Sequence, residues 1–270
     1  MLNRMDFLGQ TVCEVLPVGA KEPTSEDVQL LQQNISSYLG HLLRDTFGKG
    51  PESVYVSIGH TYITVYLRNF MTPSEKVLME QDHELIVMQT RDRLMQTMVP
   101  ELSGYLEGLV GQKPQELYYD WGLHNRSGMI MGVFPRPVGF AGIDERYEGR
   151  REIEHEIIEI SRNAQKPPEE IYSCALNERT VVVVRNGILV RIEKELIRHG
   201  VGLLLRQAKR NLEKSYMHNH TRLPSIFGKR IVDSFVDWDF DLDKSVMVFV
   251  LNPKPLRGEN ERSMVDKVES

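Results

Sequence analysis

The chain has few cysteines and no long hydrophobic run. Only two cysteines, Cys13 and Cys174, occur among its 270 residues, and neither stands in a CxxC or metal-ligand spacing. A disulfide framework needs more than this, so we expect a reducing compartment, the cytoplasm. The most apolar stretches, residues 181–184 and 201–205, are far shorter than the ~18 to 20 residues that cross a bilayer. We therefore expect no direct insertion into a membrane.

The chain also lacks an excess of positive charge. It has 33 Lys and Arg residues against 38 Asp and Glu residues, a formal net charge of −5. Proteins that bind a nucleic-acid backbone carry a basic patch or stripe, so we expect no nucleic-acid partner. The N-terminus has no continuous apolar segment of the kind found in signal peptides, because residues such as Arg4 and Asp6 interrupt it.

Motifs for catalysis, cofactors and metals are missing as well. The chain has no GxSxG, no P-loop and no dinucleotide-binding glycine pattern after a strand. His218 and His220 are close together, but no third ligand follows at zinc spacing. The aspartates that alternate along 237–243 resemble a calcium loop without its glycine and bidentate glutamate, so we interpret them as the solvent face of a strand and its turn. We expect no catalytic residue, no cofactor and no metal ion.

What the chain does contain is an internal repeat. Residues 51–55 (PESVY) match residues 168–172 (PEEIY) at an offset of 117. Further matches at this offset are Arg68-Asn69 with Arg185-Asn186, Gly111 with Gly228, and Asp120-Trp121 with Asp237-Trp238. Glu75-Lys76 matches Glu193-Lys194 at 118, which predicts a one-residue slip that the following helix compensates. These matches indicate a tandem duplication.

The duplication sets the expected domain boundaries. We expect repeat 1 at 24–135, a linker at 136–150, a more divergent repeat 2 at 151–252 and a flexible tail at 253–270. The linker begins in a segment rich in proline and glycine, and the tail is rich in charge.

Each repeat predicts the order helix, hairpin, long helix, hairpin. In repeat 1, apolar residues recur at helical spacing over 28–42, and residues 54–67 alternate with period two around a turn. Residues 72–75 (TPSE) form a capping box with proline at the first helical position. A long helix should begin there and be interrupted at Pro100, and its counterpart in repeat 2 should span 190–217. We therefore expect an α+β fold of two tandem α-β-β-α-β-β repeats, each an antiparallel sheet with helices on one face.

The tyrosines at 55, 62 and 66 lie on one face of the first predicted hairpin. A contiguous face of this kind is rarely left bare, and a duplicated chain can bury it against its own second copy. We therefore expect an approximate twofold axis between the repeats, an intrachain pseudo-dimer, and leave a further homodimer open. Tyr55, Tyr62, Tyr66, Trp121 and Trp238 are also our candidates for a surface that contacts a partner. For the two tryptophans, burial in the core is the alternative.

Two Arg-Asn pairs are the candidates for ligand binding. Arg68-Asn69 and Arg185-Asn186 each leave a predicted strand and lead toward a helix start. A guanidinium beside the free N–H groups of a helix start can hold bicarbonate, phosphate or a carboxylate. The alternative is that each arginine pairs with a nearby carboxylate and each asparagine occupies a turn.

Repeat 1 contains Gly50-Pro51, the alternating strand pair that follows, and residues 72–78 (TPSEKVL) at a helix start. In these residues the chain resembles the MpsC-like family of bacterial proteins. Repeat 2 keeps Glu193-Lys194-x-Leu196 but has Leu189-Val190 in place of the Thr-Pro pair. A function tied to that cap would therefore belong to repeat 1 alone.

The resemblance implies a non-enzymatic, cytoplasmic accessory protein of a cation-coupled (Na+/H+) system that generates membrane potential and supports inorganic-carbon uptake. The implied partner is a membrane transporter or pump subunit, reached by protein contact, which would place the protein peripherally at the membrane. Two alternatives stay open: a sensor module for a small anion such as bicarbonate, phosphate or a carboxylate, and an enzyme with an unmarked site.

Overall fold

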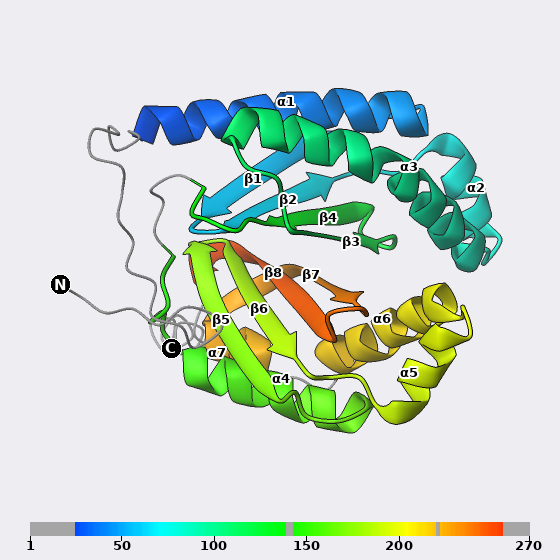
Figure 1. Ribbon diagram of the computed structural model, residues 1–270, viewed down its shortest axis with the longest axis vertical. Helices are drawn as coiled ribbons and strands as arrows, with labels where there is room; N and C mark the ends of the chain where they lie inside the picture. Colours follow the sequence, from blue (N-terminus) through cyan, green and yellow to red (C-terminus); the bar gives the residue numbers. More distant parts are fainter. Residues whose placement is uncertain (1–24, 139–142, 220–221, 256–270) are drawn as a thin grey trace, which may run out of the picture.

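The computed structural model describes residues 25–138, 143–219 and 222–255. Within them the chain forms two four-stranded antiparallel sheets that face each other, with helices on the outer face of each (Figure 1). The layers thus run helix, sheet, sheet, helix. This arrangement confirms the predicted α+β fold of two tandem repeats with helices on one face of each sheet.

The two repeats have the same element order, except that repeat 2 has an additional short helix, α7, before its second hairpin. Repeat 1 contains α1 Ser25–Phe47, β1 Ser53–Gly59, β2 Tyr62–Arg68, α2 Pro73–Glu80, α3 Glu84–Val110, β3 Glu116–Gly122 and β4 Ser127–Val133. Repeat 2 contains α4 Arg150–Ala164, β5 Glu170–Asn177, β6 Thr180–Asn186, α5 Arg191–Arg198, α6 Gly202–Asn219, α7 Leu223–Phe227, β7 Lys229–Asp239 and β8 Lys244–Pro255. The strand orders, β1-β2-β4-β3 and β5-β6-β8-β7, put β3 and β7 at sheet edges.

The capping box at the start of α2 is present as predicted. The backbone N–H of Thr72 donates to Glu75 Oε2 at 2.7 Å, and the N–H of Glu75 donates to Thr72 Oγ1 at 3.3 Å. In repeat 2, Val190 has no side-chain acceptor, and only the bond from its N–H to Glu193 Oε2 remains, at 3.0 Å. Repeat 2 therefore keeps half of the box.

The prediction of one long helix after each first hairpin was wrong. Both repeats break it into two helices at a residue with positive φ, Asp82 at 59° and Gly200 at 79°. The break turns the chain, so Leu85, which a single helix would carry inward, is 51% exposed. Val77, which we also expected to face inward, lies before the break and is 52% exposed. The proline at 100 does not interrupt α3, because buried side chains on both of its flanks hold the helix against the core.

The one-residue slip between the repeats lies in a hairpin and not in a helix. A register shift between Ala175 and Asn177 adds one residue to the β5–β6 hairpin, and from there to α6 the structural offset is 118. Arg185, opposite Ser245 on β8, therefore occupies the position of Leu67, opposite Gly128 on β4. The matching Arg-Asn pairs in the sequence are not structurally equivalent, which corrects that part of our repeat alignment.

The strand that ends repeat 2 is longer than predicted. β8 continues to Pro255, so residues 252–255, expected to lead into or form the tail, are part of the sheet. Residues 256–270 lie outside the described residues. Within the expected linker, Asp144 pairs with Ala175 as an isolated bridge, and α4 begins at Arg150.

Three apolar clusters fill the spaces between the layers. Each sheet packs against its own helices, with Ile35 and Met95 in the cluster of repeat 1 and Ile157 and Met217 in that of repeat 2. The third cluster lies between the two sheets: Tyr62, Tyr118, Met129, Met131, Val133, Cys174, Leu176, Val182, Val184, Phe235, Val246, Val248 and Val250. The two repeats thus share one core, and nonpolar burial holds them together.

This shared core covers most of the tyrosine face. Tyr62 is buried in it, and Tyr66 packs against its edge with a hydrogen bond to Asp233 of β7 at 2.7 Å. The prediction that the second copy covers these side chains is confirmed for both. Tyr55 remains 46% exposed.

Candidate functional site: a buried polar network between the repeats

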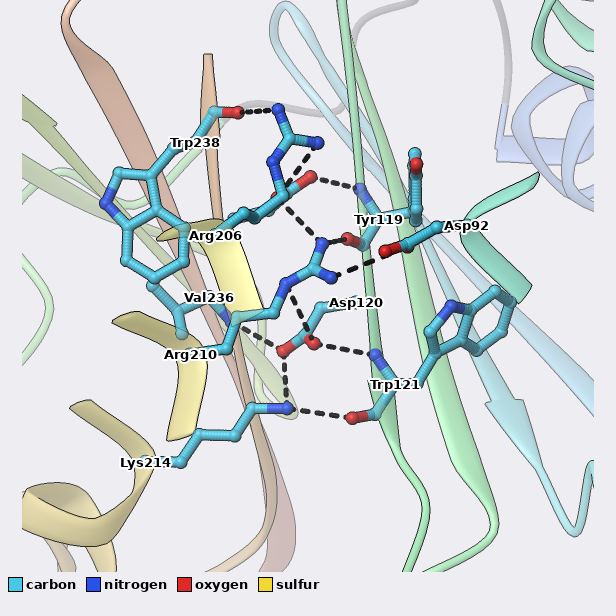
Figure 2. A network of polar contacts seen from close by, with 10 residues as sticks. Asp92, Tyr119, Asp120, Trp121, Arg206, Arg210, Lys214, Val236 and Trp238 are labelled. Carbon is cyan, nitrogen blue, oxygen red and sulfur yellow. Dashed lines mark hydrogen bonds and ion pairs between the residues drawn. The ribbon is translucent and has the colours of Figure 1, made fainter. Parts of the chain in front are cut away.

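The edge strands β3 and β7 lie side by side and exchange hydrogen bonds through aspartates. Asp120 Oδ2 accepts the backbone N–H of Val236 at 2.9 Å (Figure 2), and Asp237 Oδ2 accepts the backbone N–H of Tyr119 at 2.9 Å. Each residue here stands 117 positions from its counterpart, so the two bonds are the same contact made in both directions. Such reciprocity is the mark of a twofold relation between the repeats.

The two carboxylates accept hydrogen bonds from backbone N–H groups that an edge strand would otherwise leave unpaired. An edge strand presents unpaired N–H groups, which invite pairing with other chains unless something covers them. Here the Asp120 and Asp237 carboxylates satisfy N–H groups of the opposite repeat. The same residues that recur in the sequence as the two Asp-Trp pairs therefore join the two sheets at their edges.

Helix α6 supplies cations to both carboxylates. Arg210 donates from Nη2 to Asp237 Oδ1 at 2.8 Å and to the Tyr119 carbonyl at 2.6 Å, and its Nε lies 3.4 Å from Asp120 Oδ1. Lys214 Nζ lies 2.6 Å from Asp120 Oδ2, and Arg206 donates to the Trp238 carbonyl at 2.9 Å (Figure 2). Burial lowers the pKa of Arg210, but Asp237 and the other carboxylates outweigh it and raise the pKa, so the guanidinium stays charged.

Asp92 of α3 completes the network. Its Oδ1 lies 3.7 Å from Arg210 Nη1, and at the structural offset of 118 the two residues occupy equivalent positions in their repeats. Equivalent residues that contact each other lie on the twofold axis, so Asp92 and Arg210 mark its place. Burial raises the pKa of Asp92, with Arg210 and Arg206 acting in the opposite direction.

The network has three carboxylates and three cations, and four of its buried atoms, Asp92 Oδ1, Arg206 Nε, Arg210 Nε and Arg210 Nη1, make no hydrogen bond. Asp92, Asp120 and Asp237 are buried and face Arg206, Arg210 and Lys214. A buried charge is tolerated when it has a partner of opposite sign, and in some proteins such pairs select one arrangement of the parts they join. The arrangement can therefore hold the two repeats in a single relative orientation.

The candidate anion-binding residues have separate carboxylate partners. Arg68 Nη2 donates to Glu52 Oε1 at 2.9 Å and Asn69 to Glu52 Oε2 at 2.7 Å on the surface of repeat 1. These two bonds hold the pKa of Glu52 below its usual value, and the bond from Asn69 has the larger effect. Arg185 is buried in repeat 2, 2.8 Å from Glu213 Oε2. The structure does not bring the two arginines together, and their anion-binding role stays a prediction.

Asn186 is the remaining candidate of that set, and it donates to Glu170 at 3.2 Å on the surface of repeat 2. Asn69 adopts a positive φ of 50°, as does its structural counterpart Gly187 at 64°. The turn conformation expected for the asparagine is therefore found in repeat 1, while in repeat 2 a glycine occupies it.

The two tryptophans lie in the cores of their repeats. Trp121 is buried beside Phe70, with the Arg91 guanidinium 4.6 Å from the ring centre. Trp238 is equally buried, with Lys209 Nζ 5.3 Å from the ring centre. Of our candidates for a partner surface, only Tyr55 is substantially exposed, and whether these residues contact a partner stays a prediction.

Sequence reasoning missed the network itself. The repeated Asp-Trp pairs pointed to this region of the structure. We interpreted the pairs through their tryptophans, however, and wrongly placed Asp237 on a solvent face. It is buried because its strand is an edge strand that packs against the other repeat. Asp92 and Arg210 carry no sequence signal, since equivalent positions with opposite charge do not match in a repeat search.

Fold and network together define a class: a fused pseudo-dimer in which two copies of one α+β unit share a core and a buried ionic seam. A family model described as "Na+-translocating membrane potential-generating system (MpsC)" matches residues 28–136 and 146–253, one segment in each repeat. The chain belongs to this family. Neither the curated proteins nor the solved structures contain a significant match. Among the described residues, no helix combines the length and apolar character needed to cross a bilayer.

Proposed function

We propose that this protein is a non-enzymatic accessory component of a Na+-translocating system that generates membrane potential, and that it acts at the cytoplasmic face by contact with a membrane subunit. The observation that carries the proposal is the family match, which spans both repeats. A link to inorganic-carbon uptake is a further expectation from the same family.

The use of the charged groups supports a binding role over catalysis. The carboxylates at the seam between the repeats are buried and face cations of the same seam, whereas a catalytic group must contact substrate. Fusion of two copies into one body also suits an adaptor, since it presents paired helical surfaces in a fixed orientation.

The test is purification of the tagged chain from detergent-solubilised membranes of its native organism. We expect an integral membrane subunit to co-purify at a constant ratio, and the reciprocal tag on that subunit to recover this chain. In a strain without the gene, the Na+-dependent membrane potential reported by a voltage-sensitive dye should fall and return on complementation. Recovery of soluble proteins alone, or an unchanged potential in the deletion strain, contradicts the proposal.

A further inference from the structure

Exposed apolar side chains gather on two equivalent helical corners. Corner 1, residues 73–86, joins α2 to α3, and corner 2, residues 191–204, joins α5 to α6. At the structural offset of 118 the two segments match residue for residue. The apolar side chains exposed on them are Val77, Leu85 and Ile86 on corner 1, and Ile192, Leu196, Leu203 and Leu204 on corner 2. A gathering of this kind marks an interaction surface more often than scattered side chains do.

The two corners lie on the same side of the molecule and flank the twofold axis (Figure 1). Leu85 stands seven residues, about two helical turns, before Asp92, and Leu203 stands seven residues before Arg210. Asp92 and Arg210 mark the axis, so α3 and α6 both run from their corners to it. The exposed apolar groups therefore belong to one face, and this face carries the pseudosymmetry of the chain.

Both repeats keep an apolar pair at the start of the second helix of the corner. Leu85-Ile86 matches Leu203-Leu204, and each of the four side chains is at least 41% exposed. An exposed apolar pair adds little to the fold, so its presence in both copies points to a contact outside the chain. A partner that covers both pairs at once must itself present equivalent groups twice, and a second copy of this chain does so.

The two corners carry opposite net charge. Among the side chains that reach solvent, corner 1 has three carboxylates and one cation, a net charge of −2, and corner 2 has three cations and one carboxylate, a net charge of +2. These groups are Glu80, Asp82, Glu84 and Lys76 on corner 1, and Arg191, Lys194, Arg198 and Glu195 on corner 2. The glutamates at 75 and 193 are buried, and each is paired with a cation of the next helix.

Charged neighbours reduce the two net charges but leave their signs. Arg126 lines the groove beside corner 1, which brings that side to −1. Asp243 lies 2.7 Å from Lys194 of corner 2, which brings that side to +1. The sign difference goes back to the sequence, since Glu80 and Asp82 of repeat 1 are replaced at the equivalent positions of repeat 2 by Arg198 and Gly200.

This charge difference selects between two ways of joining two such faces. A twofold axis between two copies sets corner 1 either against corner 1 of the second copy or against its corner 2. Apolar pairs meet in both arrangements. The first arrangement brings like charges together at both contacts, and the second brings opposite charges together at both. Charge complementarity therefore favours the second arrangement.

We propose that this face joins two copies of the chain in a homodimer in which corner 1 of each copy contacts corner 2 of the other. Leu85 and Ile86 pack against the equivalent leucine pair of the second copy, and Glu80 lies toward the basic side chains of its α5. The assembly contains four repeats related by three perpendicular twofold axes, of which only the axis between the chains is exact. It leaves the outer faces of α1 and α4 uncovered, and it does not rest on the proposed function.

Sedimentation equilibrium of the purified chain tests for the dimer. We expect twice the chain mass of 31.2 kDa, falling toward the mass of one chain on dilution. Leu85→Ser with Ile86→Ser, and separately Leu203→Ser with Leu204→Ser, should each raise the dimer dissociation constant at least about tenfold, because every contact uses one pair of each kind. Thermal unfolding verifies that the variants fold. A wild-type chain that stays monomeric at its highest soluble concentration overturns the proposal, as does a dimer that either variant leaves intact.

Charge reversals test which corners meet. Glu80→Lys with Asp82→Asn makes corner 1 positive, and Arg191→Glu with Arg198→Glu makes corner 2 negative. Each variant alone should dimerise at least about tenfold more weakly than the wild type, because its two corners then carry the same sign. An equimolar mixture of the two variants should restore the dimer, since each corner again meets its opposite. A mixture that stays monomeric, or variants that each dimerise like the wild type, overturns the proposed pairing.

Glu107→Lys with Glu152→Gln is the matched control. It changes the net charge of the chain by the same amount as the corner 1 reversal, at exposed positions near the end of α3 and the start of α4. We expect this variant to dimerise as the wild type does, and loss of its dimer would contradict the proposal by showing that total charge governs association. If a membrane subunit covers the corners instead, the chain purifies as a monomer and the leucine variants lose that subunit. That result overturns the dimer and leaves the accessory role standing.

Discussion

Repeat 1 and repeat 2 share a fold, but at one pair of neighbouring core positions repeat 1 has nonpolar residues and repeat 2 has charged residues. Leu67 and Met95 of repeat 1 are equivalent to Arg185 and Glu213 of repeat 2, and all four are buried. In repeat 2 the pair is an ion pair at 2.8 Å, and Arg185 also donates to Ser161 and Ser245, at 2.8 Å each. The position therefore accepts either a nonpolar contact or a charge pair, provided that both partners change together.

A second difference lies on the twofold axis, where Asp92 meets Arg210. In a symmetric dimer of a single repeat, this position would face its own copy, and both sides would carry the same charge. Fusion into one chain removes that restriction, since each copy of the position is encoded separately. The comparison indicates that duplication permitted an asymmetric, attractive contact where a symmetric dimer allows only a like pair.

The largest expected effect comes from breaking this axis contact. Arg210→Asp places a fourth carboxylate among Asp92, Asp120 and Asp237 and removes their shared cation. Loss of one partner from a buried ion pair costs about 3 to 5 kcal/mol, so we expect at least this loss in the free energy of unfolding measured with urea.

The double variant Asp92→Arg with Arg210→Asp tests the symmetry. By the twofold relation, a guanidinium at position 92 faces the same two carboxylates, Asp237 and Asp120, and the Val236 carbonyl in place of that of Tyr119. We expect the double variant to recover most of the lost stability, with a strong coupling energy in a double-mutant cycle. Additive losses from the two single changes would show that the two positions are not interchangeable.

The next largest loss of stability is expected from changing the buried ion pair of Arg185 and Glu213 in repeat 2. Glu213→Met alone leaves the Arg185 guanidinium buried without its carboxylate, at a cost of about 3 to 5 kcal/mol in urea unfolding. Arg185→Leu with Glu213→Met installs the residues of repeat 1 and should be neutral or stabilising by about 1 to 4 kcal/mol. A double variant as unstable as the single one would mean that the surroundings in repeat 2 accept only the ion pair.

Local features of the structure were predicted from the sequence, and tertiary features were mostly not. The capping box at Thr72 and the alternating strands were predicted because neighbouring residues determine them. The break at Asp82 was not, because a non-glycine residue with positive φ leaves no periodic signal. Gly200 in the other copy is a helix breaker, but the predicted helix 190–217 ran through it. Comparing the copies at the correct offset would have transferred that signal to repeat 1.

In the candidate site, too, the local pattern was found in the sequence and the tertiary contacts were not. The repeated Asp-Trp pairs were found in the sequence, but the burial of Asp120 and Asp237 depends on which strand ends at the sheet edge and on what packs there. The bulge near Asn177 shifts the offset by one, so Arg185 matched Arg68 in sequence while lying at the place of Leu67. An ion pair between distant helices and strands has no local pattern that reveals it.

A moderate effect should distinguish Arg91 from its counterpart Lys209. Arg91 binds Glu75 through two bonds, at 2.7 and 2.8 Å, and also donates to the Phe70 carbonyl at 3.0 Å. Lys209 makes a single bond to its carboxylate, Glu193, at 2.7 Å, and also donates to Gln165. Arg91→Lys should therefore cost about 1 to 3 kcal/mol in urea unfolding, because a lysine cannot reproduce the two-bond geometry. Retained stability would show that the second bond and the carbonyl contact contribute nothing.

The smallest effect concerns the helix caps. Thr72→Ala removes the acceptor for the Glu75 N–H and should cost about 1 kcal/mol. Val190 has nearly the same backbone angles as Thr72, φ −85° and ψ 163° against −75° and 161°, so a threonine there can accept the N–H of Glu193. Val190→Thr should thus complete the box and add up to about 1 kcal/mol. The two caps belong to separate helices, so the double variant should unfold near the wild-type temperature, measured by calorimetry. A destabilised Val190→Thr variant would mean that the half-buried valine methyl contributes more through packing than a hydroxyl gains through the cap.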